Sequence, residues 1–246
     1  MSELTAEDYA YRLPDYWIVH EHKSGSLFER LHQAYVSRAI EIIKASGAKT
    51  VLEVGCGDGW NCGEMVKAGL DVVGIDWSRN AILYASMFVP SAKFLRGDLR
   101  DPEFLNQFPD KFDALALIKV LEHIPPNDRI SAMINIATPL KTGGTFVLTT
   151  PSVNSPNDPP LHYQHFTEEK LRHIAKEAGL IVKSIEGYGD VEAERAYWSR
   201  MRWLENSLYS IKPAATSLTE KYHRETNLQN TPIDRCHGFV MTMTKL

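Results

Sequence analysis

The chain has 246 residues, 43% of them hydrophobic and 24% charged, which is typical of a globular protein with a substantial core. That length fits one large α/β domain with additions better than two complete domains. The formal net charge of -4 provides no excess of cations for attracting a polyanion, so nucleic acid is not favoured as a partner.

The cysteines and the N-terminal residues indicate a compartment. Cys56, Cys62 and Cys236 are odd in number and lack the spacing of a metal site, which is typical of a reducing environment. No apolar run approaches the roughly 18 residues of a membrane span. The acidic N-terminus also lacks the basic and apolar regions of a signal peptide. We therefore predict a cytoplasmic protein that does not enter a membrane.

Residues 1–26 are polar and aromatic and show no clear period, so we predict an N-terminal arm or cap outside the main domain. Such an arm could fold over a ligand site, with Tyr16 and Trp17 as candidate wall residues. The main domain is predicted to span residues 27–246. It opens with a helix over 27–45, where apolar residues recur at helical spacing and Gly47 can cap the end.

A strand, a glycine turn and a helix are predicted over residues 50–68. Residues 50–54 form the short apolar strand, and Gly55, Gly57 and Gly59 allow a sharp turn before the amphipathic helix. Glycines let a ligand approach the backbone amides, and the start of the helix adds a favourable dipole. A ligand site is therefore predicted at this turn.

The rest of the chain alternates between strands and helices. Further strands are predicted at 71–75, 92–96, 112–118, 145–150, 180–185 and 238–244, and further helices at 78–89, 127–138 and 167–179. Ser78 and Thr167 are predicted to cap two of these helices, and Gly143 and Gly144 to turn the chain into the fifth strand. This alternation predicts a mostly parallel sheet with helices on both faces.

An insertion of about residues 188–236 separates the last two strands. Its helix-like part, 193–209, is rich in aromatic residues. We predict that the insertion is either a cover over the substrate or a dimerisation surface, so a homodimer is one of the two outcomes.

The glycine turn carries a more specific signal. It reads Glu53-Val54-Gly55-Cys56-Gly57-Asp58-Gly59, with an acid two residues before the first glycine and the third glycine one residue too early for a dinucleotide fingerprint. An acid here would repel a pyrophosphate but suits a ligand with a cationic amine. The motif resembles the first motif of the class I S-adenosylmethionine-dependent methyltransferases, Glu-x-Gly-x-Gly-x-Gly, in particular the type 11 or UbiG-like group.

The resemblance spans about residues 40–185 and implies a fold and a cofactor. The implied fold is a Rossmann-like α/β domain with a seven-stranded sheet in the order 3-2-1-4-5-7-6, strand 7 antiparallel, and helices on both faces. The implied cofactor is S-adenosyl-L-methionine. Its predicted binding residues lie at or just after the ends of the first four strands: Glu53, Gly55, Cys56, Gly57, Asp76, Trp77, Asp98, Leu99 and Lys119.

The resemblance also implies roles for some of these residues. Asp76 would accept hydrogen bonds from the ribose hydroxyls, and Asp98 would meet the adenine amino group beside the backbone of Leu99. Lys119 would present its backbone carbonyl to the methionine amine, while its own ammonium is either solvated or close to an acid. Cys56 is interpreted as a small filler between the glycines.

Methyl transfer from a sulfonium is an in-line displacement, so the protein has mainly to align donor and acceptor. A hydroxyl acceptor benefits from a general base, and histidine is the side chain best suited to that near neutral pH. Three histidines follow the fourth and fifth strands: His123, His162 and His165. Each could instead organise its loop. We predict a methyltransferase acting on a small molecule, with a hydroxyl as the preferred acceptor.

Two alternatives stay open at this point. Lys119-Val120-Leu121-Glu122-His123 is similar to the Glu-x-x-Glu-His segment of metal-dependent small-RNA 2′-O-methyltransferases, but a lysine replaces the first Glu. A cation there is hard to reconcile with a divalent ion, so no metal is predicted. The second alternative is a non-catalytic protein that binds the cofactor or a partner. A dehydrogenase is disfavoured by Glu53 and the glycine spacing.

Overall fold

The computed structural model of the protein describes residues 27–155, 162–192, 195–196, 199 and 228–246. The predicted N-terminal arm and most of the insertion, with its aromatic helix-like part, lie outside the described residues. None of the helices in the described ranges is long and apolar enough to cross a membrane.

Strands and helices alternate as the sequence predicts. The helices are α3 (Leu27–Ala45), α4 (Trp60–Lys67), α5 (Arg79–Phe88), α6 (Pro102–Asn106), the 3-10 turn η1 (Leu121–His123), α7 (Arg129–Ala137) and α8 (Glu168–Glu177). The strands are β1 (Thr50–Val54), β2 (Asp71–Asp76), β3 (Lys93–Arg96), β4 (Phe112–Ile118), β5 (Leu140–Pro151), β6 (Leu180–Asp190) and β7 (Cys236–Lys245).

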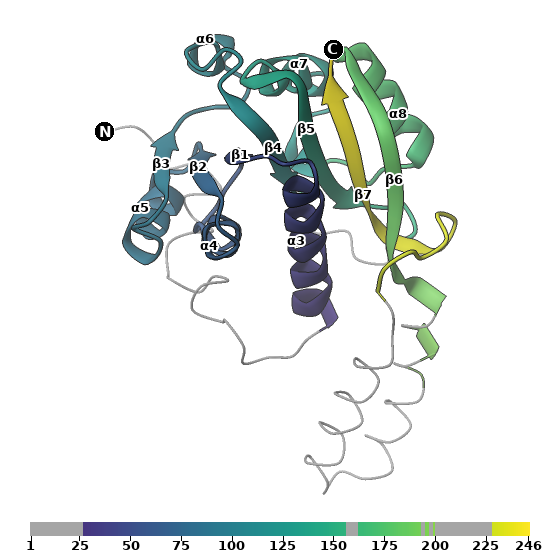
Figure 1. Ribbon diagram of the computed structural model, residues 1–246. Helices are drawn as coiled ribbons and strands as arrows, with labels where there is room; N and C mark the ends of the chain where they lie inside the picture. The colour runs from purple at the N-terminus through teal and green to yellow at the C-terminus, as the bar shows by residue number, and fades with distance from the viewer. Residues whose placement is uncertain (1–26, 156–161, 193–194, 197–198, 200–227) are drawn as a thin grey trace, which may run out of the picture.

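One seven-stranded sheet in the order β3-β2-β1-β4-β5-β7-β6 forms the centre of the molecule. β7 runs antiparallel to both of its neighbours, and the other pairs are parallel. The predicted strand order and the direction of the last strand are confirmed. In Figure 1, α4 and α5 lie beside β2 and β3, α3 lies in front of β4 and β5, and α8 lies beside β6.

The alternation of side chains along β1 explains the two layers of helices. Leu52 and Val54 belong to the core beneath α7 and α8, whereas Val51 belongs to the core beneath α3 and α4. Successive side chains of a strand point to opposite faces, so an apolar strand can hold a helical layer on each face. Burial of both faces therefore accounts for the continuous apolar run in the sequence.

The caps of the helices are largely as predicted. The Ser78 hydroxyl accepts a hydrogen bond from the Ala81 amide at 3.2 Å, and the Thr167 hydroxyl accepts one from Lys170 at 3.2 Å. The short helix α6 was not predicted. A signal for it was present, because Asp101 caps it and Pro102 occupies its first turn.

Three strand boundaries differ from the prediction by more than one residue. β5 begins at Leu140, and Gly143 and Gly144 lie inside it at an irregularity where the partner strand steps from Phe112 to Ala114. A glycine pair read as a turn is here a bulge, for which glycine's positive φ is equally suited. β6 and β7 are also longer than predicted, because Asp190 pairs with Cys236.

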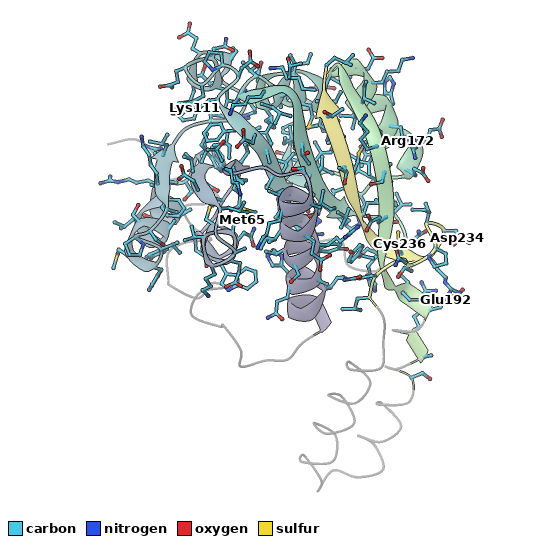
Figure 2. All side chains as sticks on the ribbon, in the orientation of Figure 1. Met65, Lys111, Arg172, Glu192, Asp234 and Cys236 are labelled. Carbon is cyan, nitrogen blue, oxygen red and sulfur yellow. The ribbon has the colours of Figure 1, made fainter. Side chains whose placement is uncertain are left out.

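The longer pair of strands fixes where the insertion leaves the domain. Residues 188–190 belong to β6, so the segment between the strands is 191–235 rather than 188–236. β6 is parallel to β5, because both are antiparallel to β7, and so its end lies at the carboxyl edge of the parallel sheet. Figure 2 shows Cys236 at that lower edge, with Asp234 and Glu192 beside it.

Candidate active site

The three glycines between β1 and α4 all have left-handed backbone conformations. Their φ angles are 77° for Gly55, 54° for Gly57 and 84° for Gly59, a region that other residues enter at a cost. A Cβ atom on Gly55 would collide with the Val120 side chain after β4. The turn therefore needs glycine for its shape, and it lies directly against the segment that contains Lys119.

Glu53 is completely buried at the end of β1. Its Oε1 accepts a hydrogen bond from Asn61 Nδ2 at 2.6 Å, and its Oε2 accepts one from Cys62 Sγ at 2.9 Å. Burial raises the pKa of Glu53 to about 7, against the lowering effect of these hydrogen bonds. The carboxyl group is thus held by α4, behind the turn.

His32, which no motif in the sequence singles out, extends this network into α3. Its Nε2 lies 2.9 Å from the Asn61 Oδ1, and its ring contacts Trp60 with centroids 5.6 Å apart. Burial lowers the pKa of His32 to about 4, so the ring is neutral at pH 7. No local pattern could reveal this residue, because α3 and α4 meet only in the tertiary fold.

Asp76 and Trp77 follow β2. Asp76 is buried, and its carboxylate accepts hydrogen bonds from the Gly57 amide at 3.0 Å and the Ser78 amide at 2.9 Å. It therefore joins the glycine turn to the end of β2. Trp77 is half-buried, with the Arg100 guanidinium 5.6 Å from its ring centroid.

Asp98 and Leu99 follow β3, next along the same edge. Asp98 is partly exposed, and its carboxylate accepts hydrogen bonds from the Arg100 amide at 2.9 Å and Arg100 Nη2 at 2.7 Å. Partial burial acts to raise the pKa of Asp98, but the Arg100 contacts outweigh it and hold that pKa below its usual range. Leu99 is half-buried against the core.

Cys56, between two of the glycines, is buried. Burial raises the pKa of its thiol, and a protonated buried thiol is unreactive. This environment agrees with the interpretation of Cys56 as a filler. Its backbone remains part of the turn.

Lys119 directly follows β4 and has an unusual backbone conformation for a lysine, with φ 59°. Its amide donates to the Thr149 carbonyl at 3.0 Å. Its ammonium lies 3.6 Å from Glu122 Oε1 and 5.7 Å from the centre of the Tyr35 ring. Of the two predicted surroundings, the structure places the ammonium next to an acid. Desolvation lowers the pKa of Lys119, and Glu122 opposes this.

The three candidate histidines come together although they belong to two separate loops. The rings of His123 and His162 meet edge to face with centroids 4.7 Å apart. His162 Nδ1 lies 2.9 Å from His165 Nε2. Burial lowers the pKa of His162 to about 4, so its ring is neutral at pH 7.

Tyr163 and Arg129 hold these loops together. The Tyr163 amide donates to the Glu122 carbonyl at 2.9 Å. Arg129, a buried residue in the first turn of α7, donates from Nε to the Ile124 carbonyl at 2.9 Å and lies 4.9 Å from the centre of the Phe166 ring. Arg129 was not singled out in the sequence, because an arginine at a helix start ordinarily points to solvent.

Glu122, His123 and His162 also form a metal-type set of donors. One donor atom from each lies within 4.8 Å of the others. Glu122 is completely buried, and its Oε2 accepts a hydrogen bond from the Thr150 hydroxyl at 3.0 Å. These donors are chemically suitable for a divalent cation, but the Lys119 ammonium lies beside the same carboxylate.

Residues 26–185 match a family described as a methyltransferase domain. The chain is 26% identical over 182 residues to the ubiquinone biosynthesis O-methyltransferase of Aeromonas salmonicida, covering 65% of this chain and 76% of that enzyme. It is 31% identical over 135 residues to the enzyme of the same name from Dechloromonas aromatica, covering 51% of this chain and 55% of that enzyme.

Solved structures share the fold. A SAM-dependent methyltransferase from Archaeoglobus fulgidus superimposes with a TM-score of 0.63 at 19% identity, covering 94% of this chain and 100% of that one. The magnesium protoporphyrin IX methyltransferase of Synechocystis, solved with bound SAM, gives a TM-score of 0.55 at 17% identity, covering 89% of this chain and 82% of that one.

These relatives do not favour an RNA 2′-O-methyltransferase or a non-catalytic binding protein, since the curated ones named above are O-methyltransferases of ubiquinone biosynthesis. The family match covers well over half of the chain, and the sheet has the strand order expected of that family. The chain belongs to the methyltransferase-domain family and is a class I S-adenosylmethionine-dependent methyltransferase.

Proposed function

We propose that this methyltransferase transfers the methyl group of S-adenosylmethionine to a hydroxyl group of a small molecule in the cytoplasm. The observation that carries the proposal is the meeting of His123, His162 and His165 beyond β4 and β5, since the segment before His123 packs against the glycine turn through Val120. The printed names of the relatives, O-methyltransferases of ubiquinone biosynthesis, favour the same acceptor atom.

The carboxyl edge of β1, β2 and β3 offers features that fit the cofactor. The left-handed glycines keep side chains away from the turn, and the Asp76 carboxylate lies beside it, where it accepts hydrogen bonds from the Gly57 and Ser78 amides. In the proposed arrangement Asp76 accepts the ribose hydroxyls, and Asp98 and Leu99 flank the adenine near Trp77. The backbone of Gly55, Cys56, Gly57 and Lys119 surrounds the methionine part, with Glu53 behind it.

S-adenosylmethionine supplies an electrophilic methyl group and leaves as a neutral thioether. The residues of this chain then have two tasks, to align the acceptor oxygen and to remove its proton. The histidines after β4 and β5 perform the second task in our proposal. The 2.9 Å contact between His162 and His165 offers the proton a path from the acceptor side toward the loop.

The test uses methyl-labelled S-adenosylmethionine with purified protein and a cell extract, separated into small-molecule, RNA and protein fractions. We expect label in the small-molecule fraction. Replacing His123 or His162 with Gln should reduce that rate by about 100-fold or more, the usual range for loss of a general base. His173→Gln is the matched control, because His173 lies exposed on α8 and should leave the rate unchanged.

Asp76→Asn tests cofactor binding, whereas the histidine variants test removal of the proton. It should weaken S-adenosylhomocysteine binding in calorimetry and remove label from every fraction, because an amide is a poorer acceptor for two hydroxyls. Label in RNA would contradict a small-molecule acceptor. Full activity of both histidine variants would contradict their role as bases, while leaving methyl transfer intact.

A further inference from the structure

A positively charged side chain lies beside the metal-type donor set of Glu122, His123 and His162. One donor atom each from Glu122, His123 and His162 lies within 4.8 Å of the others, an arrangement of one carboxylate and two imidazoles that suits a divalent transition metal. The Oε1 atom of Glu122 accepts no hydrogen bond from the described residues, although it is completely buried. A buried carboxylate oxygen of this kind needs a cation nearby.

The Lys119 side chain meets that need. Its ammonium lies 3.6 Å from Glu122 Oε1, which is ion-pair distance, and about a fifth of its side chain (21%) is exposed. The position of Lys119 is held by its backbone, its amide and its ammonium. The left-handed backbone with φ 59° begins the turn after β4, the amide is bonded to Thr149, and the ammonium lies over the Tyr35 ring at 5.7 Å.

We propose that the Lys119 ammonium is the resident cation of the Glu122, His123 and His162 set, and that it excludes a divalent ion and binds the acceptor oxygen itself. A divalent ion bound to Glu122 would lie within a few ångströms of the ammonium, and their repulsion opposes binding. The ammonium is also a fixed positive charge beside the set, available to an oxygen that loses its proton to a histidine. The second part rests on the proposed function; the first does not.

The reaction step balances without a metal. The proton of the acceptor hydroxyl passes to a histidine of the set, and the resulting negative oxygen pairs with the Lys119 ammonium. The oxygen–carbon bond forms as the sulfur–methyl bond breaks. Lys119 would then raise the fraction of acceptor held as an anion, a task that in other sites a metal performs.

Manganese binding tests the first part without any acceptor. Purified apo protein is titrated with Mn²⁺, and bound ion is measured by electron paramagnetic resonance. Wild type should bind Mn²⁺ at this set only weakly or below detection, whereas Lys119→Glu should bind it at least 10-fold more tightly than the wild-type value or detection limit. The double variant Lys119→Glu/His162→Ala should lose that gain. Lys111→Glu is the matched control, since it makes the same charge change at the opposite edge of the sheet (Figure 2) and should bind as wild type does.

Calorimetry with S-adenosylhomocysteine verifies that each variant is folded, and Lys119→Met, of similar length, replaces Lys119→Glu if that variant does not fold. Binding of Mn²⁺ by wild type that His162→Ala abolishes would overturn the proposal. A Lys119→Glu or Lys119→Met protein that binds cofactor product but no more Mn²⁺ than the Lys111→Glu control would also overturn it.

Labelling kinetics test the second part with the small-molecule fraction of the extract as the acceptor pool. Lys119→Met should reduce the rate at least 100-fold, Lys119→Arg should restore about a tenth of it, and affinity for S-adenosylhomocysteine should change little. A Lys119→Met enzyme as active as wild type would overturn the acceptor role. A wild type that labels no small molecule would contradict the proposed function instead, and the manganese result would still stand.

Discussion

At the scale of single residues, the ionisation of Glu53 depends on the fold. The carboxyl group is completely buried, and its hydrogen-bond donors Asn61 and Cys62 are uncharged. Loss of water outweighs these two hydrogen bonds, and the pKa of Glu53 is raised from its ordinary 4.5 to about 7. A protonated carboxylic acid therefore lies behind the glycine turn when the solution is mildly acidic.

This shift predicts how stability depends on pH. The unfolded carboxyl group loses its proton near pH 4.5, while the folded one retains it up to about pH 7, so the contribution of Glu53 to stability is complete below pH 4.5. It declines as pH rises through that window, by at most about 3 kcal/mol.

The measurement compares urea unfolding of wild type with Glu53→Gln at intervals between pH 4.5 and 8. Because glutamine does not ionise, the stability of wild type minus that of the variant should fall as pH rises and become constant above about pH 7. A difference that stays flat across this range, or that rises, would show that the folded carboxyl group is already ionised at pH 5.

At the scale of elements, the start of α4 depends on Gly59. Its φ angle is 84°, and a Cβ added there would lie 2.9 Å from the Ala85 Cβ and 3.0 Å from the Phe94 ring. Gly69, after the same helix, has a similar φ of 89° but nothing within 4 Å of an added Cβ. An alanine at position 69 would therefore have backbone strain alone, whereas an alanine at position 59 would have the same strain and a steric overlap as well.

Gly69→Ala should destabilise the protein by about 1 kcal/mol, the backbone cost of a left-handed residue with a side chain. Gly59→Ala should cost about 3 kcal/mol, because overpacking against α5 and β3 adds to that strain. Chemical denaturation measures both. Equal losses in the two variants would mean that Ala85 and Phe94 move aside freely, and that the close approach of α4 and α5 is not tightly packed.

At the scale of the whole molecule, one ion pair joins α3 to the far edge of the sheet. Arg38 donates from Nε and Nη2 to the two oxygens of Glu186, on β6, at 2.9 Å each. The same guanidinium donates from Nη1 to Glu41 on its own helix at 3.0 Å. The Glu186 side chain is 19% exposed and the Glu41 side chain 57%, so the two contacts differ mainly in solvation and geometry.

Double-mutant cycles with Arg38→Ala should give a coupling energy of about 1–2 kcal/mol for Glu186→Ala, because a bidentate pair shielded from water keeps more of its attraction. The coupling to Glu41→Ala should be about 0.3 kcal/mol, as for exposed pairs on a helix. Equal couplings, or a smaller one for Glu186, would indicate that α3 is held on the sheet by apolar packing alone.

Local sequence was sufficient for most of the fold. The helix over Leu27–Ala45 has the predicted bounds, as does the strand Phe112–Ile118, because each is long or apolar enough for its period to be unambiguous. The glycine turn was equally readable, since left-handed backbone at alternate positions leaves glycine as the ordinary choice. The bulge at Gly143 and Gly144 was misread, because the same residues serve turns and bulges and only strand pairing separates them.

The candidate site divides in the same way. The sequence by itself determined the methyltransferase fold, the acidic glycine motif and the residues that follow each strand, because parallel strands bring their carboxyl ends to one edge. Only the tertiary structure decided that His123 meets His162, that His32 reaches Asn61, and that Lys119 is the cation beside Glu122. These contacts join segments far apart in the chain or depend on the angle of a single turn, and no local propensity encodes either.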